Sequence, residues 1–277
     1  RSNIAREDYA GAESCRECHA ENYREWSTHP HRWMNAKATA EALKGDFSGQ
    51  QTIKYQGGVG RFVMEEGVPK MILEREEIYW KYRIHRTIGS RFFQYYIGVV
   101  EEERGINLAS DDERWTTDLV LPFGYWIENR EWVPTVHVNR EPDRDLNIPD
   151  VYLKGIFINY DRDCSECHTT LSFDNWMVKR IGSERFSTFT PYQVNVHLGK
   201  LLQTAHPERV PPERPLTEYS YQDIGRIIGG ERSDPVSGRL AMGITCEGCH
   251  LGSAEHATKS TRTKGAAIPS FFPVSPD

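Results

Sequence analysis

The six cysteines of this sequence fall into three C-x-x-C pairs with none left over, and a histidine follows each pair. The resulting motifs are CRECH at 15–19, CSECH at 164–168 and CEGCH at 246–250. In C-x-x-C-H, two thiols about one helical turn apart add to the two vinyl groups of a porphyrin, and the histidine binds the iron. The pattern therefore predicts three covalently attached haem c groups.

Every cysteine and three of the ten histidines are used by these motifs. The expected thioether donors are Cys15, Cys18, Cys164, Cys167, Cys246 and Cys249. The expected proximal iron ligands are His19, His168 and His250. A structural Cys₄ zinc site would leave one C-x-x-C pair and the three histidines unexplained. A thioredoxin-type disulfide suits one motif beside a βαβ unit rather than three in loop-rich surroundings.

Distal ligands would come from the seven remaining histidines. His31, just past the first motif's helix, is favoured over His29, which precedes a proline in a turn. His256 lies too close in sequence to His250 to reach over the same ring, so we expect it to bind the iron of a neighbouring haem. The third ligand is open between His137, His197 and His85, each of which also has an ordinary surface or hydrogen-bonded interpretation. Methionine is a further possibility at Met34, Met177 and Met242, and it would raise the potential of that haem.

Composition and charge narrow the functional classes. The chain has 34 Lys and Arg against 40 Asp and Glu, a net charge of −6, which argues against a nucleic-acid partner. It contains no apolar stretch long enough for a transmembrane helix. Because haem c is attached outside the cytoplasm, we expect a periplasmic or extracellular protein. The sequence starts at Arg1 without a signal peptide, so we expect that signal to have been removed.

The arrangement of apolar residues predicts three segments. Residues 1–48 would hold the first haem, with two helices over 14–45. The first is broken by Pro30, and the second runs from about His31 to Gly45. Residues 49–145 alternate apolar and polar positions and predict a β-rich insert, with a hairpin turn at EEGVP. Residues 146–277 would hold the second and third haems, with helices at 191–203 and 218–228. The expected fold is mainly α and irregular, a haem-organised multihaem cytochrome c fold with a small antiparallel β insert.

The motifs and their surroundings resemble the multihaem cytochromes c of the cytochrome c-554 and c-prime-like group. The similar segments are CRECHAENYREWSTHPH, RIHRTIGSRFFQYYIG, CSECH and CEGCHLGSAEH. The resemblance implies that His31 and His256 are distal ligands. Two departures are Leu-Gly-Ser at 251–253 in place of Gly-Pro-Gly, and three haem motifs where relatives often carry four or more. Related chains often continue past a segment like the last residues here, so we expect that the chain is a fragment or a processed form.

Electron transfer is the expected function, through mostly bis-histidine haems, in a free carrier or a subunit of a larger redox complex. The expected partners are redox proteins, such as other cytochromes or a membrane-bound redox complex. The alternative is a multihaem oxidoreductase in which one haem with an open site acts on a small nitrogen or oxygen species. Catalytic residues are not indicated by any motif, and a non-enzymatic role is favoured.

Overall fold

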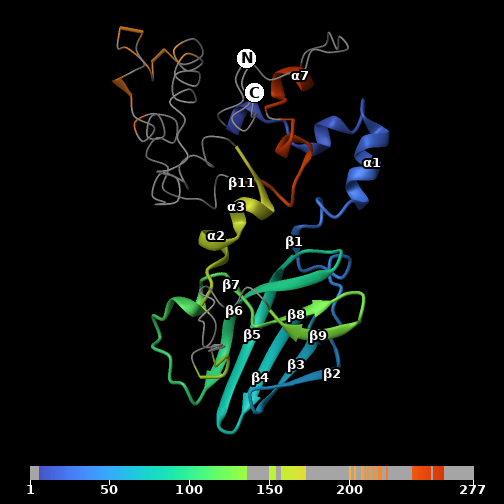
Figure 1. Cartoon of the computed structure of the whole chain (residues 1–277), viewed down its shortest axis with the longest axis vertical. Helices are drawn as coiled ribbons and strands as arrows, with labels where there is room; N and C mark the ends of the chain where they lie inside the picture. The colour runs from blue at the N-terminus through green and yellow to red at the C-terminus, as the bar shows by residue number, and fades with distance from the viewer. Residues whose placement is uncertain are drawn as a thin grey trace, which may run out of the picture. The chain divides into compact units, whose positions relative to one another are not determined.

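The structure, a computed structural model, describes residues 6–135, 150–153, 157–172, 239–250 and 252–258, with isolated positions between 200 and 223. The chain forms two compact units (Figure 1). Unit 1 combines Arg1–Thr28 with Thr169–Asp277, and unit 2 is His29–His168. The three segments expected from the sequence, at 1–48, 49–145 and 146–277, stay a prediction.

Unit 2 is built on one antiparallel sheet. Its path begins with four long strands joined by short turns and continues through β6 to β8 and β9. The strands are β2 (Ser48–Tyr55), β3 (Gly58–Glu65), β4 (Val68–Arg75), β5 (Ile78–Ile88), β6 (Phe93–Arg104), β7 (Leu119–Val120), β8 (Phe123–Trp126) and β9 (Glu131–Pro134). The short strand β1 (Asn35–Lys37) pairs with the end of β5, and β7 pairs with β6.

Residues with a left-handed backbone conformation form the tight hairpin turns. Gln56 and Gly57 have φ values of 48° and 77°, and Glu66 and Gly67 have 50° and 79°. Two successive positive φ angles are the geometry of a two-residue turn whose twist matches the flanking strands, and glycine adopts it without strain. The hairpin predicted at EEGVP is therefore confirmed, with Glu65 paired to Val68 across it.

The sheet curls until its two end strands, β2 and β9, contact each other, which makes a nearly closed barrel (Figure 1). Phe62 of β3 and Trp132 of β9 stack inside it with ring centroids 3.4 Å apart. Phe47, Tyr96 and Tyr125 also pack against Trp132. The large apolar surface of each ring is removed from water only when the end strands meet. Burial of these rings therefore favours closure of the barrel.

The expected fold class, mainly α and irregular with a small β insert, is wrong because the sheet is so extensive. The segment expected to be a small β insert forms the large sheet of unit 2, and the described structure is mainly antiparallel β rather than mainly α. The helix expected from His31 to Gly45 is absent. Residues 31–34 form a turn, and Asn35–Lys37 pair with β5 instead. Backbone pairing with an existing strand outweighs the helix propensity of this alanine-rich stretch.

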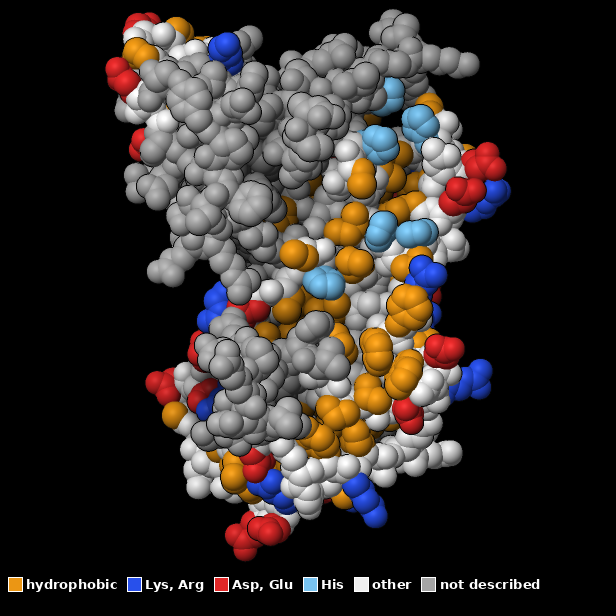
Figure 2. Space-filling view, in the orientation of Figure 1, with side chains coloured by type: hydrophobic (Ala, Val, Ile, Leu, Met, Phe, Trp, Pro, Cys, Tyr) orange, Lys and Arg blue, Asp and Glu red, His pale blue; other side chains and the backbone are white. Residues whose placement is uncertain are grey.

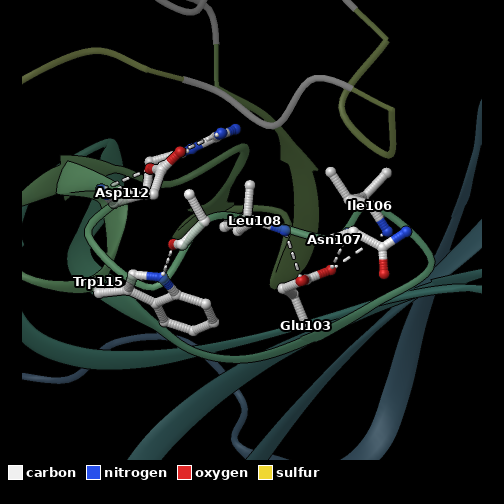
Figure 3. A network of polar contacts seen from close by, with 8 residues as sticks. Glu103, Ile106, Asn107, Leu108, Asp112 and Trp115 are labelled. Carbon is white, nitrogen blue, oxygen red and sulfur yellow. Dashed lines mark hydrogen bonds and ion pairs between the residues drawn. The ribbon is translucent and has the colours of Figure 1, made fainter.

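A polar network orders the loop that follows β6 (Figure 3). The Glu103 carboxylate accepts three backbone N–H bonds, from Ile106, Asn107 and Leu108, at 3.2, 3.2 and 2.8 Å. Farther along, the Asp112 carboxylate caps a short 3-10 helix, η3 (Glu113–Trp115), by accepting from the Arg114 backbone N–H. These carboxylates replace the hydrogen bonds that the loop backbone would otherwise make to water.

Unit 1 contains short elements around the first and third cysteine motifs. They are η1 (Arg6–Asp8), η2 (Ala12–Cys15), α1 (Ala20–Thr28), β10 (Thr169–Leu171), β11 (Arg239–Met242), η7 (Cys246–Gly248) and α7 (Ala254–Thr258). Helix α1 ends two residues before Pro30, so the helix expected there is confirmed. The helices expected at 191–203 and 218–228 lie almost wholly outside the described residues.

Candidate haem-attachment sites

All three cysteine motifs form one helical turn. The His19 backbone N–H donates to the Cys15 carbonyl at 2.9 Å, and His250 donates to Cys246 in the same way at 2.8 Å. In the second motif, α3 (Ser165–His168) supplies the turn, and the Cys167 N–H donates to the Cys164 carbonyl at 3.2 Å. Positions i, i+3 and i+4 share one face of a helix, so each turn presents two thiols and an imidazole on the same side. This donor set fits a covalently attached haem.

The thiols of each motif have a common pattern of exposure. The first cysteine of each pair is half-buried and the second is exposed, and no disulfide joins any of the six. Burial, together with the neighbouring Cys246 and Glu247, raises the pKa of the Cys15 thiol to about 11. The first and third motifs, far apart in sequence, thus place their leading thiols close together.

His256 lies close to His19, the histidine of the first motif. It sits on α7, and its ring centroid is 6.3 Å from that of His19, with 34° between the ring planes. The expectation that His256 binds the iron of a haem other than the one at His250 stays a prediction. Surface histidines lie beside hydrophobic side chains (Figure 2).

Glu247, inside the third motif, is 1% exposed. Its carboxylate accepts backbone N–H bonds from Ala10 at 2.8 Å, Gly11 at 2.7 Å and Ser253 at 3.1 Å. A second link in unit 1 runs from the Trp26 indole N–H on α1 to the Ile244 carbonyl, at 2.8 Å. Sequence reasoning missed both residues. Their only signal was an acidic residue within the CEGCH motif and a tryptophan about two helical turns after CRECH.

The second motif lies in unit 2, which also contains the barrel. Helix α2 (Tyr160–Asp163) is capped by the Asn159 side chain, which accepts from the Arg162 N–H, and it leads into Cys164. The Tyr160 ring is fully buried, and its hydroxyl accepts a hydrogen bond from the Asn35 side-chain amide. The chain just after His31 is therefore fixed against the chain just before Cys164.

His29 and His31 lie six and four residues before Asn35, and both side chains are exposed. Their ring centroids are 4.7 Å apart, and the His31 backbone N–H donates to His29 Nδ1 at 3.2 Å. The expectation that His31 begins a helix is wrong, since it lies in a turn. Its position beside the approach to the second motif agrees with its expected role as a distal ligand, which stays a prediction.

The ring of His85 contacts a carboxylate through one nitrogen. It lies on β5, and its Nε2 bonds to Asp118 Oδ1 at 2.5 Å. Arg86 pairs with the other oxygen of Asp118 at 3.3 Å. This contact fits the ordinary interpretation of His85 as a sheet residue held by a carboxylate, and its role as a candidate distal ligand stays a prediction.

Of the other candidate ligands, some lie within the described residues and some lie outside them. His137, His197 and Met177 lie outside the described residues. Met34 precedes β1 and Met242 ends β11. Within the described ranges, no group of three or more His, Cys, Asp or Glu side chains is arranged to hold a bare metal ion.

Comparison with known proteins identified no relative of this chain. No family model matches the chain, and no curated protein or solved structure matches it. In the described part of the chain, no helix has the length and apolar character needed to span a membrane.

Proposed function

We propose that this chain is a trihaem c-type cytochrome that transfers electrons through closely spaced, mostly bis-histidine haems. The observation that carries the proposal is the separation of the His19 and His256 rings, which come from opposite ends of the sequence. The helical turn shared by the three C-x-x-C-H motifs supports it, because all the expected attachment residues have the same local geometry.

The ring separation has a simple explanation in iron ligation. An imidazole nitrogen lies about 2 Å from the metal it binds, and the ring centroid lies about 1 Å farther out. Two imidazoles on opposite faces of one iron therefore have centroids about 6 Å apart. His19 and His256, at 6.3 Å, fit this arrangement, whereas His29 and His31, at 4.7 Å, are too close to sandwich one iron.

The haem at Cys15 and Cys18 would thus have His19 as its proximal and His256 as its distal ligand. Haem supplies one-electron iron chemistry, and two histidine ligands leave no open position for a substrate. The contact between Cys15 and Cys246 supports a short distance between the edges of the first and third haems. For the second haem, His31 is the proposed distal ligand, because Asn35 and Tyr160 join its segment to the second motif.

Partners and location follow from the same proposal. Attachment of haem c takes place outside the cytoplasm, so the protein would be periplasmic or extracellular. A net charge of −6, made more negative by haem propionates, favours docking on a basic patch of a redox partner. Such a chain would act as a free carrier or as a subunit of a larger redox complex.

Haem content and spin state test the proposal. The purified protein should give three haems per chain in a pyridine haemochrome assay, and replacing Cys164 and Cys167 with serine should remove one of them. The oxidised protein should be low-spin by EPR and unchanged by cyanide. Fewer than three haems would contradict the motif assignment, and a strong high-spin signal that shifts with cyanide would favour an open-site oxidoreductase instead.

A further inference from the structure

Glu247 is an almost completely buried carboxylate in the third cysteine motif, among the described residues of unit 1. It is 1% exposed, and its two oxygens accept three backbone N–H bonds of 2.7 to 3.1 Å. Burying a carboxylate is costly unless such donors replace water, so this set of bonds fixes the carboxylate and its partners to one another.

The three donors lie at structurally important points. Ala10 and Gly11 directly precede η2, the turn that ends at Cys15. Ser253 directly precedes α7, and its carbonyl accepts the Ala257 N–H of the first turn of that helix. The Ser253 hydroxyl also donates to the His250 carbonyl at 3.0 Å. One carboxylate therefore ties the start of the His19 segment to the start of the His256 helix.

We infer that Glu247 is a positioning residue that holds His256 opposite His19. The inference rests on the proposed function, since it concerns the distal ligand of the first haem. The two histidines belong to segments that have no peptide connection nearby, and the five-residue helix α7 is too short to be stable alone. The bond to Glu247 fixes Ser253, the residue directly before α7, and with it the reach of His256.

Glu103 offers a matched control on the barrel. Its carboxylate also accepts three backbone N–H bonds, at 2.8 to 3.2 Å, but in a loop that holds no haem motif (Figure 3). Glu247→Gln and Glu103→Gln thus make the same chemical change, in which one acceptor oxygen becomes an NH₂ group facing a backbone N–H. Only the first change touches the His19 and His256 segments.

The experiment measures carbon monoxide bound to the reduced holoprotein, counted against total haem, because CO binds only an iron that has lost its distal ligand. We expect Glu247→Gln to raise the fraction of CO-binding haem by about tenfold, as expected for the loss of charge-assisted hydrogen bonds. Glu247→Asp, whose shorter side chain cannot reach all three donors, should do the same. Glu103→Gln should leave CO binding unchanged, and His256→Ala should make one haem per chain bind CO.

The outcomes separate the inference from the function beneath it. A large effect of His256→Ala with none for either Glu247 variant, at full haem content, would overturn the positioning role and leave the ligand assignment intact. No effect of His256→Ala would overturn the ligand assignment itself. Equal effects of Glu247→Gln and Glu103→Gln would show a general loosening of the protein and would also overturn the inference.

Discussion

The imidazole of His256 lies opposite that of His19, with ring centroids 6.3 Å apart. This pair joins the last described helix of the chain to the first cysteine motif. It is also the separation expected for two ligands of one iron.

Replacing His256 with methionine should preserve a low-spin first haem and raise its potential. Thioether sulfur stabilises the reduced iron more than imidazole does, so we expect a rise on the order of 100 mV in one of three redox transitions. Spectroelectrochemical titration measures it, with the wild-type chain as the reference. A titration curve identical to wild type would mean that His256 does not bind an iron.

The neighbouring pair His29 and His31 allows a direct test of the second haem. We expect His31→Ala to convert one haem per chain to high spin, because its segment is joined to the second motif through Asn35 and Tyr160. His29→Ala is the matched control, since its side chain is equally exposed and 4.7 Å away. EPR of the oxidised variants decides between them, and a high-spin signal from His29→Ala alone would transfer the role to His29.

The barrel should depend on the ring of Trp132 for its stability. Trp132→Ala removes a ring that is 6% exposed and stacked on Phe62, so we expect a loss of about 3–5 kcal/mol in the free energy of unfolding. Urea denaturation followed by far-UV circular dichroism measures this. Phe92→Ala, at a side chain 58% exposed, is the control and should change stability by less than about 0.5 kcal/mol. Similar losses in the two variants would argue against a closed aromatic core.

The Asp112–Arg114 pair should make a contribution to the free energy of unfolding that depends on pH. Hydrogen bonds from the Arg114 side chain and backbone lower the pKa of Asp112 from 3.8 to about 2. A lowered folded-state pKa stabilises the protein fully above pH 3.8, and the contribution is lost as the pH falls toward 2. The side chain is partly solvated, so screening limits the effect to about 1 kcal/mol.

Asp112→Asn should therefore lower the unfolding free energy at pH 6 by about 1 kcal/mol and reduce the loss of stability between pH 4 and pH 2. Denaturation curves at several pH values check this. A variant that loses stability with acid as steeply as wild type would show that Asp112 does not contribute.

Local patterns in the sequence were sufficient for some elements. The two-residue turn at Glu66 and Gly67 was predictable because it needs only local residue preferences. The helical turn of each C-x-x-C-H motif was equally local. The extent of the sheet was not predictable in this way, since closure depends on β2 meeting β9 and on Trp132 finding Phe62. Pairing with β5 likewise drew Asn35–Lys37 out of the helix that their composition favours.

The sequence by itself determined the proposed chemistry of this protein, because three thiol pairs with adjacent histidines have the residue types and spacing of the haem-attachment motif. Tertiary structure decided which histidines meet. His256 faces His19, and His85 is held by Asp118, through contacts between residues remote in the chain. The physical reason is that a ligand needs a position in space, and this position comes from long-range hydrogen bonds such as those of Glu247, which no local pattern encodes.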